Sequence, residues 1–242
     1  QSLYEIDPVT GNLLSAARVM GQPDAVSGET NDLVSRYTYT ARGQIDTMTD
    51  PLGRISDYDY DALGRLTQVI VALGTADEAT MRYEYDEQTV AGRAGLVTAS
   101  IDERGSRTQF EYDVLNRLIR TIEPDPDGDA GQLPSPVWEM VYDAAGNVVQ
   151  SIDARGQVSR FEYDERGRQV RVIQSDPDGN GPLVAPETTF IYDVNGNLTT
   201  VTDPLGNVTR HTYDVRNRRL ATTDPDGGVT RFRYDTDGNL IA

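Results

Sequence analysis

Apolar and polar residues alternate along most of the chain, and short polar turns interrupt the alternation at regular intervals. The segment at 208–242 contains the same unit twice, with Tyr213 and Tyr234 lying 21 residues apart. Side chains two positions apart lie on one face of a strand, so the ring two positions before each tyrosine shares its face. A unit repeated in this way predicts a quasi-linear array in which each copy packs mainly on its neighbours.

The unit recurs ten times along the chain. Two degenerate copies are assigned to Tyr4-Glu5 and Tyr39-Thr40. Eight copies carry a Tyr-Asp pair, and their tyrosines are the predicted structural repeat residues: Tyr60, Tyr85, Tyr112, Tyr142, Tyr163, Tyr192, Tyr213 and Tyr234. Several intervals are longer than 21 residues, which predicts loop inserts at 74–80, 90–95, 125–136 and 176–186, together with a loop at 20–33.

Each unit predicts two strands and two turns. A Gly or Asn four residues after the tyrosine tolerates positive φ, as a bulged hairpin turn requires, and the Asp can accept N–H bonds from the turn. The second turn is often Asp-Pro-x-Gly, as at Asp50, Asp203 and Asp224. No segment has a sustained 3.6-residue apolar period. The predicted fold is therefore all-β, a repetitive antiparallel β-hairpin array of about twenty strands with almost no helix. Its aromatic residues are expected to share one face and to form ladders across neighbouring strands.

Composition narrows the function classes. The formal net charge is −17, and all 22 basic residues are Arg. This acidity argues against binding to a nucleic-acid backbone, which needs clustered positive charge. The chain has no Cys and no apolar run of transmembrane length, so neither a disulfide framework nor membrane insertion of this segment is expected. Because it opens within a repeat, residues 1–242 are interpreted as a single array that is part of a longer chain.

The residues that could carry chemistry have simpler structural interpretations. His211, the single histidine, occupies a ring position of the repeat. Arg65, Arg117 and Arg168 recur beside turns and are expected to pair with nearby carboxylates. Without a Ser-x-x-Lys or Gly-x-Ser-x-Gly motif, and with acidic pairs spread throughout, the sequence favours a protein segment that is not an enzyme and has no cofactor.

One stretch fits a calcium-loop pattern. Asp176, Asp178, Asn180 and Glu187 are spaced as oxygen ligands within twelve residues, and a Gly permits the sharp bend. A poorer copy begins at Asp125. The opposing interpretation, that both stretches are solvent-exposed turn inserts, is favoured by their prolines and by the lack of flanking helices.

The unit Tyr-Asp-x-x-Gly-Asn/Arg-Leu, followed by Asp-Pro-x-Gly and aromatic-x-Tyr-Asp, resembles the Rhs/YD-repeat family over nearly the whole chain. The family includes bacterial Rhs polymorphic toxins, cocoon components of insecticidal toxin complexes, and teneurins. The resemblance implies a sheet that spirals into a hollow shell, of which ten repeats would form an arc. The Asp-Pro-Leu-Gly sequences at Asp50 and Asp203 fit ordinary turns, so no self-cleavage residue is transferred from the family.

Two functions remain open. The first is a structural scaffold, part of a secreted shell that encloses or presents a toxin or effector domain. The second is a cell-surface or filament-forming adhesion protein. The expected partners are the remaining repeats and effector domain of the parent chain, or copies of the segment joined end to end through strand edges. Both functions imply a secreted, extracellular or cell-surface location.

Overall fold

The computed structural model describes residues 2–18, 33–86, 95–128, 131, 133–179 and 183–241. These residues form 19 β-strands and no helix, which confirms the all-β prediction and nearly matches the expected strand number. None of them therefore belongs to a helix that could cross a membrane.

The chain divides into two compact units, Gln1–Arg117 with Ile122–Ser135, and Leu118–Thr121 with Pro136–Ala242. The strands of the first unit are Ser2–Ile6 (β1), Leu13–Arg18 (β2), Leu33–Tyr39 (β3), Ile45–Thr49 (β4), Ile55–Tyr60 (β5), Leu66–Val71 (β6), Ala79–Tyr85 (β7), Val97–Ile101 (β8) and Arg107–Tyr112 (β9). All of Leu118–Ile122 (β10) except its last residue belongs to the second unit. The remaining strands of that unit are Val137–Tyr142 (β11), Val148–Ile152 (β12), Val158–Tyr163 (β13), Gln169–Ile173 (β14), Glu187–Tyr192 (β15), Leu198–Thr202 (β16), Val208–Tyr213 (β17), Arg219–Thr223 (β18) and Val229–Arg231 (β19).

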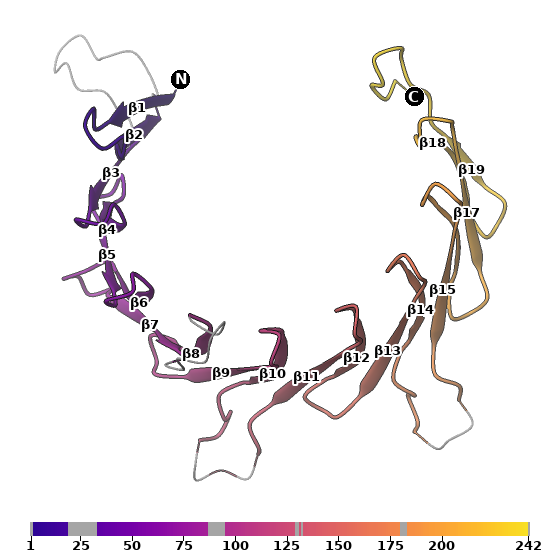
Figure 1. Ribbon diagram of the computed structural model, residues 1–242, viewed down its shortest axis with the longest axis horizontal. Helices are drawn as coiled ribbons and strands as arrows, with labels where there is room; N and C mark the ends of the chain where they lie inside the picture. Colours follow the sequence, from indigo (N-terminus) through magenta and orange to yellow (C-terminus); the bar gives the residue numbers. More distant parts are fainter. Residues whose placement is uncertain are drawn as a thin grey trace. The chain divides into compact units, whose positions relative to one another are not determined.

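Within each unit the strands pair antiparallel in sequence order. In the first unit every strand from β1 to β9 pairs with the next one. In the second unit the same holds from β11 to β19. Figure 1 shows consecutive strands side by side in a single layer within each unit. The Tyr-Asp turns therefore all lie at one edge of a unit's sheet, and the second turns lie at the opposite edge.

A β-bulge marks the tyrosine of each Tyr-Asp hairpin. In the hairpin of β13 and β14, Glu162 pairs with Arg171 and Tyr163 pairs with Gln169, so Val170 is the extra residue. The turn closes with Gly167 at φ 73°, a conformation that Gly adopts without strain. The same register shift precedes the tyrosines of other hairpins: Tyr60, Tyr85, Tyr142, Tyr192 and Tyr213. The predicted bulged hairpin is confirmed.

The prediction that aromatic side chains form ladders across neighbouring strands is wrong. The rings share a face, but a return strand without rings separates each aromatic strand from the next. Phe161 pairs with Val172, and Tyr58 pairs with Val69. Each ring therefore packs beside a smaller side chain, and aromatic and small residues alternate across the face.

Neither unit has a conventional core. Among the described residues only Val69, Ala72 and Ala99 are buried, and all three belong to the first unit. The rings at the repeat positions are mostly half-buried, because a single layer of strands leaves both faces accessible. Apolar stabilisation therefore comes from strips of half-buried side chains shared by adjacent strands.

The first repeat is placed differently from the sequence assignment. Asp7 forms the turn, since its N–H donates to the Asn12 carbonyl and its carbonyl accepts from Gly11 N–H, each at 2.8 Å. Ile6 pairs with Leu13 across the register shift, as a repeat tyrosine does in later units. The repeat pair is therefore Ile6-Asp7 instead of Tyr4-Glu5, because the turn carboxylate and the bulge define the position.

The inserts extend connections between strands, as predicted. Those at 74–80, 125–136 and 176–186 join a return strand to the next aromatic strand. The first insert is shorter than predicted, because β7 already begins at Ala79. The insert at 90–95 lies on a Tyr-Asp turn, and all of it except Gly95 falls outside the described residues. The loop at 20–33 also lies outside them, apart from Leu33.

Candidate functional site

The recurrent side chains of the repeat lie along the side of each sheet where Tyr-Asp turns join the ends of the strands. We call this side the Tyr-Asp rim. It comprises the turns at 7–12, 39–44, 60–65, 85–86 and 112–117 in the first unit. In the second unit it comprises the turns at 142–147, 163–168, 192–197, 213–218 and 234–239.

Most rim turns are organised by a carboxylate, and in the turn at 39–44 the Thr40 hydroxyl takes this place. Asp164 Oδ1 accepts hydrogen bonds from the N–H groups of Arg166 and Arg168, at 2.9 and 3.0 Å. Its Oδ2 accepts from Arg168 Nε at 2.7 Å. The hydrogen bonds from the Arg168 side chain and backbone lower the pKa of Asp164. The carboxylate is thereby occupied in holding its own turn, as the Asp-turn prediction required.

The predicted pairing of the recurrent arginines is confirmed. Arg65 binds Asp61, Arg117 binds Asp113, and Arg168 binds Asp164, each with an N–O distance of 2.6 Å. The side chains of these pairs keep 19–26% of their surface exposed, and an ion pair that still contacts solvent contributes little to stability by itself.

The tyrosine hydroxyls connect successive hairpins, which sequence reasoning missed. Tyr163 Oη donates to the Val148 carbonyl at 2.9 Å, and Val148 opens the return strand of the preceding hairpin. The same bond recurs in nine repeats, from Tyr39, Tyr60, Tyr85, Tyr112, Tyr142, Tyr163, Tyr192, Tyr213 and Tyr234. Each tyrosine therefore fixes its hairpin to the previous one.

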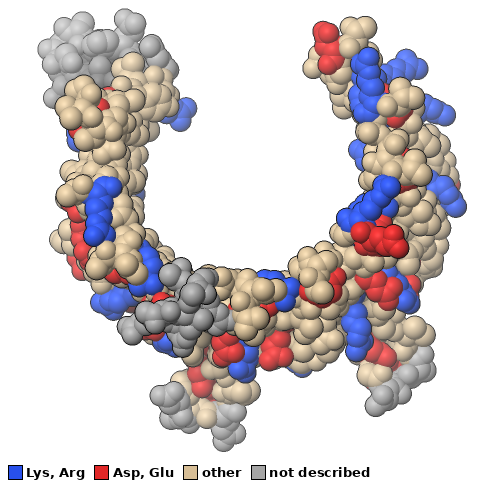
Figure 2. Space-filling view, viewed as in Figure 1, with Lys and Arg blue, Asp and Glu red and all other residues tan. Residues whose placement is uncertain are grey.

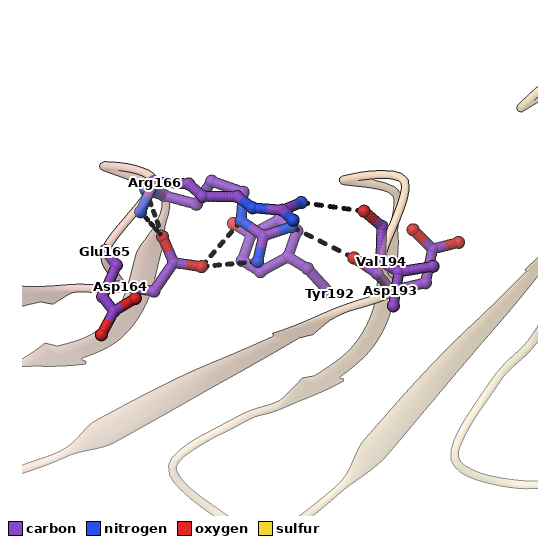
Figure 3. A pocket seen from close by; sticks show the side chains of 7 residues that line it. Asp164, Glu165, Arg166, Tyr192, Asp193 and Val194 are labelled. Atoms are coloured by element: carbon purple, nitrogen blue, oxygen red, sulfur yellow. Dashed lines mark hydrogen bonds and ion pairs between the residues drawn. The ribbon is translucent and has the colours of Figure 1, made fainter.

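Arginine side chains make the connection in the opposite direction. The Arg168 guanidinium lies 4.6 Å from the centre of the Tyr192 ring, and its Nη1 donates to the Asp193 carbonyl at 3.2 Å. Arg166 Nη1 donates to the Val194 carbonyl at 2.8 Å, and Figure 3 shows this side chain reaching across to the neighbouring turn. Arg65 stacks on Tyr85 and Arg218 on Tyr234 at the same 4.6 Å. The recurrence of Arg five residues after several repeat tyrosines was a signal that could have revealed this contact.

The face of the sheet opposite the rings carries charged pairs. Arg171 binds Glu162 of the preceding strand at 3.1 Å and Glu187 of the following strand at 2.6 Å. Figure 2, which does not single out this sheet face, shows positive and negative side chains interspersed along the chain. This arrangement offsets charges locally despite the net charge of −17.

The proposed calcium ligands lie partly outside the described residues, which omit Asn180. Asp178 Oδ2 accepts from Leu183 N–H at 3.1 Å, and Asp176 Oδ1 accepts from Asp178 N–H at 3.2 Å. Glu187 stands on β15, where its hydrogen bond with Arg171 lowers its pKa. Within the described part of the chain, no three His, Asp or Glu side chains gather to hold a metal ion. The calcium site stays a prediction.

His211 occupies the ring position that the sequence assigned to it. It pairs with Thr222 across β17 and β18, and its Nδ1 lies 3.0 Å from Thr222 Oγ1. Burial, with a smaller contribution from the Arg219 charge, lowers the pKa of this imidazole. It therefore stays neutral near pH 7 and acts as one more ring of the sheet.

A family model described as RHS Repeat matches residues 39–76, 93–130, 142–180 and 192–229, together more than half of the chain. Among curated proteins, the chain is 29% identical over 151 residues to the double-stranded DNA deaminase toxin A of Burkholderia cenocepacia, covering 61% of this chain and 9% of that protein. It is 27% identical over 199 residues to the probable deoxyribonuclease RhsB of Dickeya dadantii, covering 75% and 12%. Human teneurin-4 is 28% identical over 107 residues, covering 39% and 4%.

Solved structures share the fold. A crystal structure of TcdB2-TccC3-TEV superposes with a TM-score of 0.73 at 20% identity, over 99% of this chain and 12% of that one. A Photorhabdus luminescens Tc holotoxin pore structure gives 0.70 at 18% identity, over 99% and 13%. The chain thus spans about a tenth of the length of these relatives. The repeated Tyr-Asp hairpins and the family match agree, and the chain belongs to the RHS Repeat family.

Proposed function

We propose that this segment is a structural scaffold, one part of the wall of a secreted shell that encloses or presents a toxin or effector domain. The observation that carries the proposal is a contrast in length. This chain covers only 9% and 12% of two relatives that are named for a DNA deaminase toxin and a deoxyribonuclease. In such a protein the repeats would form framework and another region would perform the chemistry.

The contacts of the rim support a framework role. Its tyrosine hydroxyls, turn carboxylates and Arg65, Arg168 and Arg218 guanidinium groups are engaged in bonds within and between hairpins. A side chain that holds its own turn is a poor candidate for binding a substrate or transferring a proton. The rest of the repeats and an effector domain are the partners that this role requires, and it requires a location outside the producing cell.

Adhesion at a cell surface is the second candidate. It is favoured by the match to human teneurin-4, although that match covers only 39% of this chain. In this case the framework would present a binding surface and would enclose nothing.

The test uses the complete polypeptide that carries these repeats. Its candidate effector region is probed by limited proteolysis at increasing urea concentrations, in the wild type and in a Tyr163→Ala, Tyr213→Ala double variant. Both substitutions remove a ring and a bond between hairpins. The shell predicts that the effector region resists protease until the repeats unfold, and that the double variant loses this protection at lower urea.

Val184→Ala is the matched control, because Val184 is 86% exposed in an insert and should leave the protection unchanged. An effector region cleaved equally fast in all three proteins without urea would contradict enclosure. Attachment of that same protein to cell surfaces would then establish the adhesion role.

A further inference from the structure

The position five residues after each repeat tyrosine determines whether the next tyrosine ring is covered. Where this residue is Arg65, Arg168 or Arg218, its guanidinium lies 4.6 Å from the centre of the next ring. Three separate repeats thus show the same cation held on a tyrosine face. The ring and its turn form a recurrent binding arrangement for a guanidinium group.

Several rim turns carry an uncharged residue at this position, among them Gln44, Asn147 and Asn197. Gln44 itself reaches the next turn, where its Nε2 donates to the Gly64 carbonyl at 2.7 Å. Asn147 stands at the arginine position of the turn after β11, and its Nδ2 donates to Asp143 Oδ2 at 2.9 Å. The amide is neutral and too short to cover the next ring, that of Tyr163. In the part of the chain that the structure describes, no guanidinium lies over Tyr163.

An open groove lies beside Asn147 and the Tyr163 ring. It is lined by Asn147, Phe161, Tyr163, Asp164, Glu165 and Arg166, among others. The Arg166 guanidinium is held by the next turn, because its Nη1 donates to the Val194 carbonyl. The Tyr163 ring is held in place from behind, because its hydroxyl donates to the Val148 carbonyl at 2.9 Å. The lining of the groove therefore combines the Tyr163 ring, held by its hydroxyl, with the Phe161 ring and the acidic Glu165.

We infer that this groove binds an arginine side chain presented by an extended segment of a partner polypeptide. The guanidinium would stack on Tyr163 as Arg168 stacks on Tyr192. It would donate to the Asp164 carbonyl, the counterpart of the Asp193 carbonyl that accepts from Arg168 at 3.2 Å. Glu165 and the net charge of −17 favour a cationic partner.

Arginine fits this groove better than lysine does. A guanidinium is planar, stacks on a ring and still donates hydrogen bonds in its plane, whereas an ammonium is a compact and strongly hydrated charge. The repeats that fill the arrangement from within use Arg, and this chain contains no Lys.

A second asparagine at the same position shows why the groove at Tyr163 is distinctive. Asn197 Nδ2 donates to Asp193 Oδ2 at 2.8 Å and also lies 2.9 Å from Asn217 Oδ1 of the next turn. That amide bridge closes the approach to the next turn, so the inference is confined to the groove of Asn147 and Tyr163.

The test titrates the chain with three blocked tripeptides, Gly-Arg-Gly, Gly-Lys-Gly and Gly-citrulline-Gly, and follows the NMR signals of the Tyr163 ring and the Asn147 amide. The arginine peptide should bind most tightly, and citrulline, which has the same shape without the charge, should bind most weakly. Asn147→Arg should fill the groove from within and weaken binding of the arginine peptide about tenfold, as loss of one cation–aromatic contact implies.

Two further variants separate stacking from general attraction to an acidic protein. Ala154→Arg adds the same charge in an exposed turn at the opposite edge of the sheet and should leave the affinity unchanged. Arg168→Asn should uncover Tyr192 and create a second site for the arginine peptide. Equal weakening by Asn147→Arg and Ala154→Arg, or equal affinity for the arginine and lysine peptides in every variant, would overturn the inference.

Discussion

At the scale of the residue, the repeat tyrosine has two roles that depend on different parts of its side chain. The ring fills the half-buried face, as the two-residue spacing predicts. The hydroxyl reaches a carbonyl 15 residues earlier in the case of Tyr163 and 26 residues earlier in the case of Tyr39. The second role could not be predicted from the sequence, because it depends on how two hairpins are offset.

Removing one hydroxyl tests the second role. Tyr163→Phe keeps the ring and deletes the bond to the Val148 carbonyl, so it should lower the free energy of unfolding by about 1 kcal/mol. Tyr163→Ala removes the ring as well and should lower it by about 2–4 kcal/mol. Urea unfolding followed by circular dichroism measures both. A Phe variant as stable as the wild type would show that the hydroxyl contributes nothing.

The turn carboxylates make stability depend on pH. Hydrogen bonds in the turns lower the pKa of Asp164, and the pKa values of Asp61, Asp113, Asp143, Asp193 and Asp214 are lowered likewise. A carboxyl group with a lowered folded-state pKa stabilises the fold above its unfolded pKa, and this contribution is lost as pH falls through the folded value.

The urea midpoint should therefore be constant from about pH 7 to pH 5 and should fall below about pH 4. Asp164→Asn, which cannot ionise at this position, should start from a lower midpoint and show a smaller decrease with acid. A midpoint that stays constant down to pH 2.5 would refute a role for the carboxylates.

At the scale of the element, the hairpin could be predicted almost completely. Its turn Asp, its Gly or Asn at positive φ and its bulge all have local sequence signals. The contacts between hairpins could not be predicted to the same extent. The expected aromatic ladders fail because return strands such as β14 lie between aromatic strands such as β13 and β15. The arginine that stacks on the next ring was assigned only to its own turn, since its second contact lies one repeat further on.

Residues of the strands and residues of the inserts should contribute unequally to the free energy of unfolding. Deleting residues 127–133 shortens a connection at the edge of the sheet and should change the free energy of unfolding by less than about 1 kcal/mol. Tyr142→Ala removes a ring and the 2.8 Å bond to the Leu118 carbonyl, and should cost several times more. Denaturant titrations of the two variants compare them directly. A deletion as harmful as the Tyr substitution would mean that the insert belongs to the framework.

At the scale of the whole molecule, stability does not come from a central hydrophobic core in the described part of the chain. The three buried residues among those described cannot organise 19 strands, and a single hairpin is marginal in water. Each hairpin gains its stability from strand pairing, from a hydroxyl bond to the hairpin before it, and in several repeats from a guanidinium on the hairpin after it. Such an array behaves as a sum of local stabilities and contacts between neighbours.

A destabilising substitution in one hairpin should consequently lower protection in the neighbouring strands and leave distant hairpins unchanged. Native-state hydrogen exchange of the Tyr163→Ala variant should show faster exchange in β13 and β14, which lose their ring, and in β12, which loses its bonded partner at Val148. Backbone amides of β17 and β18, two hairpins further along the same unit, should keep wild-type protection factors, because no contact of Tyr163 reaches them. Exposed Val215→Ala, 97% accessible at a turn tip, is the control and should leave all of these amides unchanged. Uniform loss of protection from β11 to β18 would show that the unit unfolds as one cooperative body, and that the connections between hairpins are stronger than the hairpins themselves.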